Sequence, residues 1–281
     1  MTLGNTIELE KAYKKKEFLS SPEARTIRIL AEYLEPESRF RKHHVEDTIV
    51  FFGSARTLSP EEATEQLKCV QGKIKQGQRE TSDLKNELKQ AKIDVKSSVY
   101  YQDAVELAKI ITGWSKDIYS KTNNQSRRFI VCSGGGPGIM EAANKGASEA
   151  NGYSIGLNIS LPFEQDPNPY ITSQLSFEFH YFFIRKFWFT YLAKALVVFP
   201  GGFGTIDELM ELLTLVQTKK ITKKMPILLY GKDYWDQIIN FKGLLEWGMI
   251  SPEDLDLFYI VNTPEEAFQY LRNHLTDLKN N

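Results

Sequence analysis

The sequence predicts an α/β protein with a Rossmann-like, doubly wound parallel sheet and a helical insertion after the first strand. From residue 100 onward, short apolar runs alternate with longer amphipathic segments. Such runs are typical of parallel strands that helices cover on both faces. Two of the runs end in glycine-rich turns, and we find no internal repeat and no inter-domain linker. We therefore expect an N-terminal helical extension over 1–44 and one Rossmann-like domain over 45–281.

The extension is polar and prone to form helices. Pro22 marks the start of a helix, because proline suits the first helical position. Ile27, Leu30 and Leu34 then fall on one face of that helix. We expect this apolar face to pack on the main body of the protein.

The segment DTIVFFGSAR predicts a short buried strand that ends in Gly53 and Ser54. The stretch over 61–97 differs in kind, since it is rich in Lys, Glu and Gln and has no aromatic residue. Four of its apolar residues recur at heptad spacing: Leu84, Leu88, Ala91 and Val95. This pattern predicts a helical hairpin or a protruding helix, and a role for it in oligomer contacts is a hypothesis.

The remaining elements alternate along the chain. Helices are predicted over YQDAVELAKIITGWSKDIY, IMEAANKGASEA, FHYFFIRKFWFTYLA, TIDELMELLTLVQTKK, YWDQIINFKGLLEWG and TPEEAFQYLRNHL. Strands are predicted over RRFIVCS, YSIGLNI, KALVVF, PILLYG and DLFYIVN, with a long proline-containing loop after YSIGLNI. On the aromatic-rich helix we expect Phe182, Phe183, Phe187 and Phe189 to be buried.

Composition excludes several classes of protein. The formal net charge of −1 does not indicate binding to a nucleic acid or an anionic membrane. No apolar run is long enough to cross a bilayer, and the charged N-terminus does not have the pattern of a signal peptide. The two cysteines and four histidines show no metal-ligand spacing. We therefore expect a cytoplasmic protein without a metal or another cofactor.

Two glycine turns follow predicted strands and lead directly into helices: SGGGPGIME at 133–141 and PGGFGTIDE at 200–208. A helix N-terminus offers unpaired N–H groups and partial positive charge, and glycine lets an anion approach them closely. The first turn does not fit the dinucleotide pattern G-x-G-x-x-G, because residue 139 is Ile. Neither turn ends in the Gly-Lys-Ser/Thr of a P-loop. A mononucleotide or a sugar phosphate is the better prediction, with simple tight turns as the structural alternative.

Charged residues accompany the second turn. Asp207 and Glu208 lie in the first turn of the predicted helix, where acids also stabilise a helix through its dipole. Glu208 comes one turn after Thr205 and so can face the same pocket. Arg185 and Lys186 are adjacent cations on an otherwise apolar helix, and they either form a salt bridge at its edge or meet the substrate.

These residues resemble a known family. PGGFGTIDE has the pattern P-G-G-x-G-T-x-x-E, Arg185-Lys186 stand upstream of Glu208, and GGGPGIMEAANKGA precedes both. Together they are similar to the Lonely Guy (LOG) family of nucleoside 5′-monophosphate phosphoribohydrolases, whose members are often labelled lysine decarboxylases. FFGSAR and HYFFIRK resemble its bacterial branch. The insertion at 61–97 is the main departure from the family pattern.

The resemblance implies a homodimer or higher homo-oligomer that hydrolyses the N-glycosidic bond of AMP or an N6-modified AMP (a cytokinin riboside 5′-monophosphate). Arg185 and Glu208 correspond to the catalytic pair. Glu208 would stabilise the oxocarbenium-like sugar, and Arg185 would neutralise the phosphate or orient Glu208. The implied substrate-binding residues are Gly53, Ser54, Gly134, Gly135, Gly136, Gly138, Glu164, Lys186, Gly201, Gly202, Phe203, Gly204, Thr205, Ile206, Asp207 and Thr214.

Two other functions remain to be weighed. A non-catalytic nucleotide-binding or carrier protein, such as a molybdenum-cofactor carrier, shares the glycine turns but not the pairing of Arg185 with Glu208. A lysine decarboxylase needs a lysine that binds pyridoxal phosphate and a carboxylate for the ring nitrogen. No segment of the sequence resembles that site.

Overall fold

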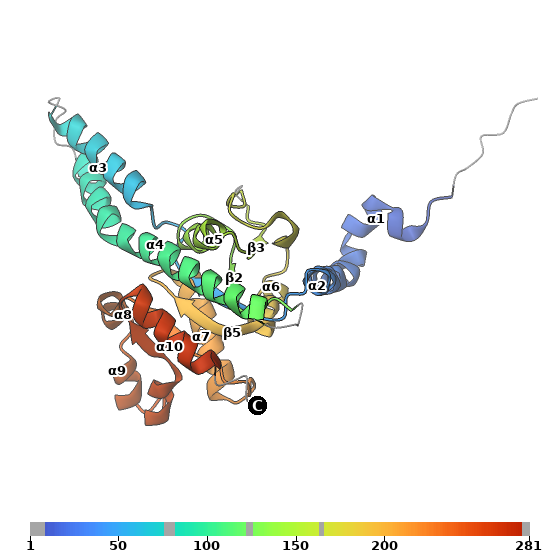
Figure 1. Cartoon of the computed structure of the whole chain (residues 1–281). Coiled ribbons are helices and arrows are strands. Elements are labelled where there is room, and N and C mark those ends of the chain that lie inside the picture. Colours follow the sequence, from blue (N-terminus) through green and yellow to red (C-terminus); the bar gives the residue numbers. More distant parts are fainter. Residues whose placement is uncertain (1–8, 76–81, 122–125, 163–165, 277–281) are drawn as a thin grey trace, which may run out of the picture.

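The computed structural model describes residues 9–75, 82–121, 126–162 and 166–276 (Figure 1). Its centre is a seven-stranded sheet with the order β4-β3-β2-β1-β5-β6-β7, in which every neighbouring pair is parallel. The strands are β1 (Thr48–Phe52), β2 (Ile130–Ser133), β3 (Ser154–Ile159), β4 (Ser176–Phe179), β5 (Ala193–Val198), β6 (Ile227–Tyr230) and β7 (Tyr259–Val261). The predicted α/β fold with a doubly wound sheet is confirmed. The edge strand β4 was not predicted, because it follows the long loop.

The chain reverses its direction of winding at β1. It moves outward in one direction from β1 through β2 and β3 to β4, and then returns to β5 on the other side of β1. In the sheet register Phe51 is level with Ser133, and Phe52 is level with Val198. The carboxyl ends of β1, β2 and β5 therefore meet at one edge, which is where ligands bind in open α/β sheets.

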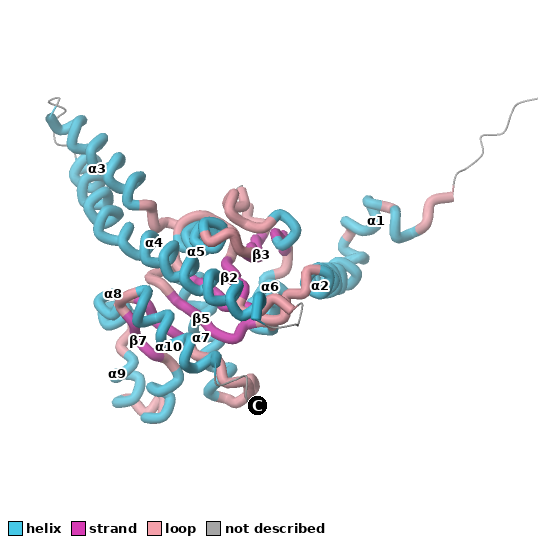
Figure 2. Tube along the Cα trace, viewed as in Figure 1, coloured by secondary structure: helices cyan, strands magenta, loops and turns pink. Residues whose placement is uncertain are grey.

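Helices cover both faces of the sheet (Figure 2). One core contains Ile49 and Phe51, and helices α4 (Ser82–Lys121), α5 (Ile139–Glu149) and α10 (Pro264–Thr276) pack on it. The other contains Val50 and Phe52, and α2 (Arg25–Lys42), α6 (Phe182–Tyr191), α7 (Phe203–Gln217) and α8 (Lys232–Ile238) pack there. Alternate β1 residues thus supply opposite faces, which explains why the strand is apolar from Ile49 to Phe52.

The insertion forms a hairpin of α3 (Pro60–Lys75) with the first half of α4, and this hairpin projects from the body (Figure 1). Its own small core consists of Val70, Leu84 and Ala91, with Leu67, Ile74 and Leu88 packed around it. The predicted helix from residue 100 is not separate from the insertion. It is the second half of α4, a continuous helix of 40 residues.

The N-terminal residues include α1 (Lys16–Ser20) and short 3₁₀ turns over Ala12–Lys14 and Pro22–Ala24. The prediction that Ile27, Leu30 and Leu34 pack on the body is wrong, since their exposed fractions are 46%, 51% and 54%. Helix α2 packs instead through Phe40 and Tyr33, which lie on a different face.

Two further expectations about helices are corrected. The segment YWDQIINFKGLLEWG forms α8 and a separate α9 (Phe241–Glu246), because the chain is extended at Ile239 and Asn240 then caps α9. Phe182 and Phe183 are more than half exposed, whereas Phe189 is buried. Further 3₁₀ helices cover Ser173–Leu175 and Pro252–Leu257.

Candidate functional site at the carboxyl ends of β1, β2 and β5

The peptide groups of Ser54 join the turns that follow the three central strands. The Ser54 N–H donates to the Pro200 carbonyl at 3.0 Å, and the Ser54 carbonyl accepts from the Ile139 N–H at 3.0 Å. A side chain at Gly53 would collide with Ile139, and one at Gly138, where φ is +70°, would collide with the backbone of Ser54. The structure therefore brings the two glycine turns together across the end of β1.

The turn after β2 is held from behind by buried amides. Asn168 donates through Nδ2 to the carbonyls of Gly135 (3.0 Å) and Gly136 (3.1 Å) and to Asn144 Oδ1 (2.9 Å). Ser133 Oγ donates to the same Asn144 oxygen at 2.6 Å and accepts from the Gly135 N–H at 3.1 Å. Since buried polar groups that are fully paired rigidify a structure, this network fixes the path of the turn.

Sequence reasoning missed Asn168 and Asn144. The position of Asn168 between two prolines in DPNPY shows only that a turn is present. The contacts of both amides depend on how the loop after β3 folds back, which the sequence does not reveal.

The turn after β5 is different, because part of it is open. Gly201 is buried, and a Cβ there would lie 2.1 Å from Thr205 Oγ1. Gly202 and Gly204 are exposed, and a Cβ at either would meet nothing within 4 Å. The first turn of α7 leaves N–H groups without intrahelical acceptors. An anion can therefore approach this helix end beside Gly202 and Gly204. Packing within the chain does not explain why these two positions lack a side chain.

Arg185 lies on α6 and reaches the other turn. Its Nε donates to the Leu157 carbonyl at 2.7 Å, and its Nη2 lies 3.5 Å from the Gly134 carbonyl. A Cβ at Gly134 would lie 2.5 Å from Met140 Sδ and 2.6 Å from the Arg185 guanidinium, so a side chain there would push on both. Burial lowers the pKa of Arg185, and the charge of Glu208 opposes that effect.

Lys186 is the cation that contacts the acids of α7. Its Nζ lies 2.8 Å from Asp207 Oδ2, 2.5 Å from Glu211 Oε2 and 3.9 Å from Glu208 Oε2. Burial alone would lower the pKa of Lys186, but its bonds to Asp207 and Glu211 raise it. Within the described ranges Arg185 forms no ion pair with Glu208. The adjacent cations thus have different partners. Arg185 contacts the backbone of Leu157 and Gly134, and Lys186 contacts the acids of α7.

Glu208 is buried in the first turns of α7, with 9% of its surface exposed. Burial raises its pKa to about 7, although Lys186 and Arg185 act to lower it. A carboxyl group with this pKa exchanges a proton near neutral pH, as general acid–base catalysis requires.

Some predicted site residues do not join this arrangement within one chain. Thr214 is exposed, and its hydroxyl donates to the Met210 carbonyl of its own helix at 2.7 Å. Phe203 has 93% of its surface exposed, and Ile206 is partly buried. Glu164 lies outside the described residues.

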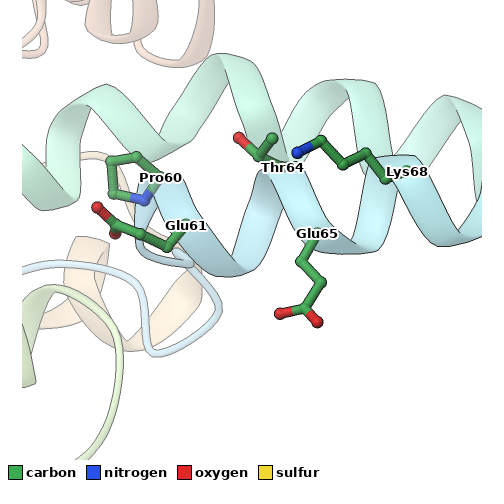
Figure 3. Close-up of a pocket in the computed structure, with 5 residues that line it drawn as sticks. All are labelled: Pro60, Glu61, Thr64, Glu65 and Lys68. Carbon is green, nitrogen blue, oxygen red and sulfur yellow. The ribbon is translucent and has the colours of Figure 1, made fainter.

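Another feature of the surface contains none of the predicted site residues. A hollow along α3 is lined by Pro60, Glu61, Thr64, Glu65 and Lys68 (Figure 3).

In the described part of the chain, no cluster of His, Cys, Asp and Glu is arranged to hold a metal ion. The described helices include none that is long and apolar enough to cross a membrane.

Comparison with curated proteins gives partial matches. A pyrimidine/purine nucleotide 5′-monophosphate nucleosidase of Escherichia coli (strain K12) is 31% identical over 114 residues, which are 37% of this chain and 25% of that protein. The chain thus spans about a quarter of the length of this relative. A probable cytokinin riboside 5′-monophosphate phosphoribohydrolase of Oryza sativa subsp. japonica is 24% identical over 182 residues, 64% of this chain and 68% of that protein.

Among solved structures, a Moco carrier protein from Chlamydomonas reinhardtii matches with a TM-score of 0.44 and 18% identity, over 82% of this chain and 99% of that chain.

Residues 140–271 match the model of a family described as possible lysine decarboxylase. This region contains Arg185, Lys186 and Glu208. Over this region, which is just under half of the chain, the sequence is therefore similar to that family.

Proposed function

We propose that the protein is a nucleoside 5′-monophosphate phosphoribohydrolase that cleaves AMP or an N6-modified AMP. Water adds to C1′ as the bond from C1′ to the base nitrogen breaks, and the base leaves with a proton. The observation that carries this proposal is Glu208, a buried carboxyl group with a pKa of about 7 beside the open turn at Gly202 and Gly204. The names of the curated relatives support the same class of reaction.

The phosphate and the sugar have separate partners in this mechanism. The free N–H groups of the first turn of α7 hold the 5′-phosphate, together with the Thr205 hydroxyl. This contact places the ribose against Glu208, whose carboxylate stabilises positive charge at C1′ and orients the water. Arg185 either neutralises the phosphate or acts on Glu208 through its charge.

Lys186 has a role that follows from its contacts. It links Asp207, Glu208 and Glu211, so it offsets the repulsion among three neighbouring carboxylates. Without that cation, Glu208 would hold its proton more tightly and would less often be the charged form that the sugar requires.

We also propose a homo-oligomer with the site near a subunit interface, as the resemblance to the LOG family implies. Any contact of Thr214 with the substrate would then form in the assembled protein. The mass of the full chain in solution tests the assembly, and a monomer at working concentration would contradict it.

The activity is tested by incubating the protein with AMP and measuring adenine by chromatography. We expect wild type to release adenine, and Glu208→Gln to lose most turnover while it keeps its fold and its affinity for AMP. Glu211→Gln is the matched control, since it removes another acid that contacts Lys186. Adenine release by Glu208→Gln at the wild-type rate would refute the role of Glu208. Binding of AMP without release by wild type would instead indicate a non-catalytic nucleotide-binding protein.

A further inference from the structure

Helix α6, which carries Arg185 and Lys186, has no capping side chain of its own. Its N-cap residue is Tyr181, which makes no side-chain capping bond. The cap comes instead from the N-terminal extension. Glu32 of α2 accepts the His180 N–H through Oε1 at 2.9 Å and the Tyr181 N–H through Oε2 at 3.1 Å. A carboxylate thus lies at the positive end of the helix dipole, where it stabilises the helix.

The other end of α6 has a cap of opposite charge. Lys223, in the segment between α7 and β6, donates through Nζ to the carbonyls of Thr190 (2.8 Å) and Tyr191 (3.1 Å). Burial and the nearby Lys194 lower the pKa of Lys223 to about 8, so its amine is still mostly protonated at pH 7. A cation therefore lies at the negative end of the helix dipole.

Side-chain packing holds α6 against α2 between these caps. The Trp188 Nε1–H donates to the Glu32 carbonyl at 3.2 Å. The ring of Tyr33 lies 5.3 Å from that of Phe187, and Phe40 lies 5.3 Å from Trp188. These contacts fix the position of α6 along α2, in addition to its orientation.

The N-terminal cap is close to the functional residues. The Arg185 N–H bonds to the Tyr181 carbonyl at 3.2 Å, in the first turn of α6. A shift of that turn therefore moves Arg185 away from the Gly134 turn and Lys186 away from α7. We propose that Glu32 and Lys223 are positioning residues, which clamp α6 at both ends and so hold Arg185 and Lys186 against the two glycine turns. The inference rests on the proposed function for its effect on catalysis.

The variants Glu32→Ala and Lys223→Met test the clamp in the full chain. Glu37→Ala is the control for Glu32, because Glu37 lies on the same helix and forms an ion pair with the exposed Arg41. Lys220→Met is the control for Lys223, since Lys220 is exposed in the same segment. We expect kcat/KM for AMP to fall at least about tenfold in both test variants, because small displacements of catalytic groups are costly. Glu32→Asp should restore part of the loss, and the controls should match wild type.

A second measurement does not depend on turnover. Glu208 is surrounded by Lys186 and Arg185 from α6 and by Asp207 and Glu211 from α7. If α6 shifts, the two cations move away and the two acids remain with Glu208. We therefore expect the pKa of Glu208, followed by carboxyl NMR without substrate, to rise in Glu32→Ala and Lys223→Met but not in the controls.

The outcomes separate the two claims. If wild type releases no adenine, the proposed function fails, and the titration of Glu208 still decides whether the clamp positions the cations. If both test variants melt at lower temperature but keep wild-type kcat, KM and Glu208 titration below the melting range, the clamp is merely structural and the inference is wrong.

Discussion

Gly201 and Gly202 are neighbours, but only at Gly201 does packing within the chain exclude a side chain. A Cβ at Gly201 would collide with Thr205, whereas a Cβ at Gly202 would enter open space. We therefore predict that Gly201→Ala lowers the melting temperature and that Gly202→Ala leaves it near the wild-type value. If the phosphate binds at this turn, Gly202→Ala should still weaken AMP binding, by about tenfold, because the added methyl group occupies the approach to the helix end.

Calorimetric titration with AMP and thermal unfolding of both variants measure the two effects separately. Gly72→Ala is a useful control, since Gly72 also has free space around it but lies in the hairpin. Unchanged affinity for AMP in a folded Gly202→Ala protein would place the phosphate elsewhere.

Glu208 links stability to pH and, under the proposed function, activity to pH as well. Its pKa is raised from 4.5 to about 7 in the folded state, so the folded protein binds more protons than the unfolded chain between these values. The free energy of unfolding must therefore fall as pH rises through this window. We predict that Glu208→Gln removes this slope and is more stable than wild type at pH 8, by on the order of 2 kcal/mol.

Urea unfolding of wild type and Glu208→Gln at pH 5 and pH 8 measures this difference, with Glu211→Gln as the control. The rate of adenine release by wild type should rise as pH increases through about 7, since the proposed mechanism uses the carboxylate form of Glu208. Equal stability differences at both pH values would show that Glu208 titrates normally.

Sequence reasoning singled out the charged residues of the candidate site but not how they pair. Arg185 and Lys186 stood out as cations on an otherwise apolar helix, and Glu208 stood out because it follows a predicted phosphate-binding turn. Which cation contacts Glu208 depends on how α6 is rotated against α7, and the structure gives this contact to Lys186. That rotation follows from packing between helices that are remote in sequence, so residue spacing could not predict it.

Among the elements, the hairpin of α3 and the first half of α4 stands apart from the sheet. Its apolar seam forms a core of its own, and it does not share buried residues with the two cores beside the sheet. We predict that deletion of 62–95 leaves a folded sheet domain. If the hairpin mediates assembly, the deletion also reduces the mass of the protein in solution.

Circular dichroism and light scattering of the deletion variant measure fold and mass together. A matched variant, Leu84→Asp, should disrupt the seam without shortening the chain, because Leu84 is 5% exposed. An unchanged oligomer in both proteins would contradict the role of the hairpin in assembly.

The sequence indicated this insertion, but the prediction that a separate helix follows it was wrong. Heptad spacing and composition separate 61–97 from the rest, yet α4 continues without a break to Lys121. The apolar residues of α4 face α3 in its first half and the sheet in its second half. A change of partner along one helix looks, in sequence, like a boundary between two helices.

For the whole molecule, the order of the strands decides where the site lies. Alternation of strands and helices predicted a parallel sheet, but it did not specify that β1 lies between β2 and β5. That order brings together turns from residues 53, 134 and 201, which lie far apart in the chain. The hydrogen bonds of Ser54 then join these turns. Binding of a ligand at one turn should therefore stabilise all three.

This connection makes a prediction about ligands with and without a phosphate. We expect AMP to slow amide hydrogen exchange at all three turns and to raise the melting temperature, by the equivalent of about 2.7 kcal/mol at a hundredfold excess over its Kd. Adenosine has the same base and sugar but offers no anion to the helix end, so it should do neither at the same concentration. Because the proposed activity would consume AMP, both ligands are best compared in Glu208→Gln. Protection by adenosine equal to that by AMP would mean that the base, and not the phosphate, is held at the end of the sheet.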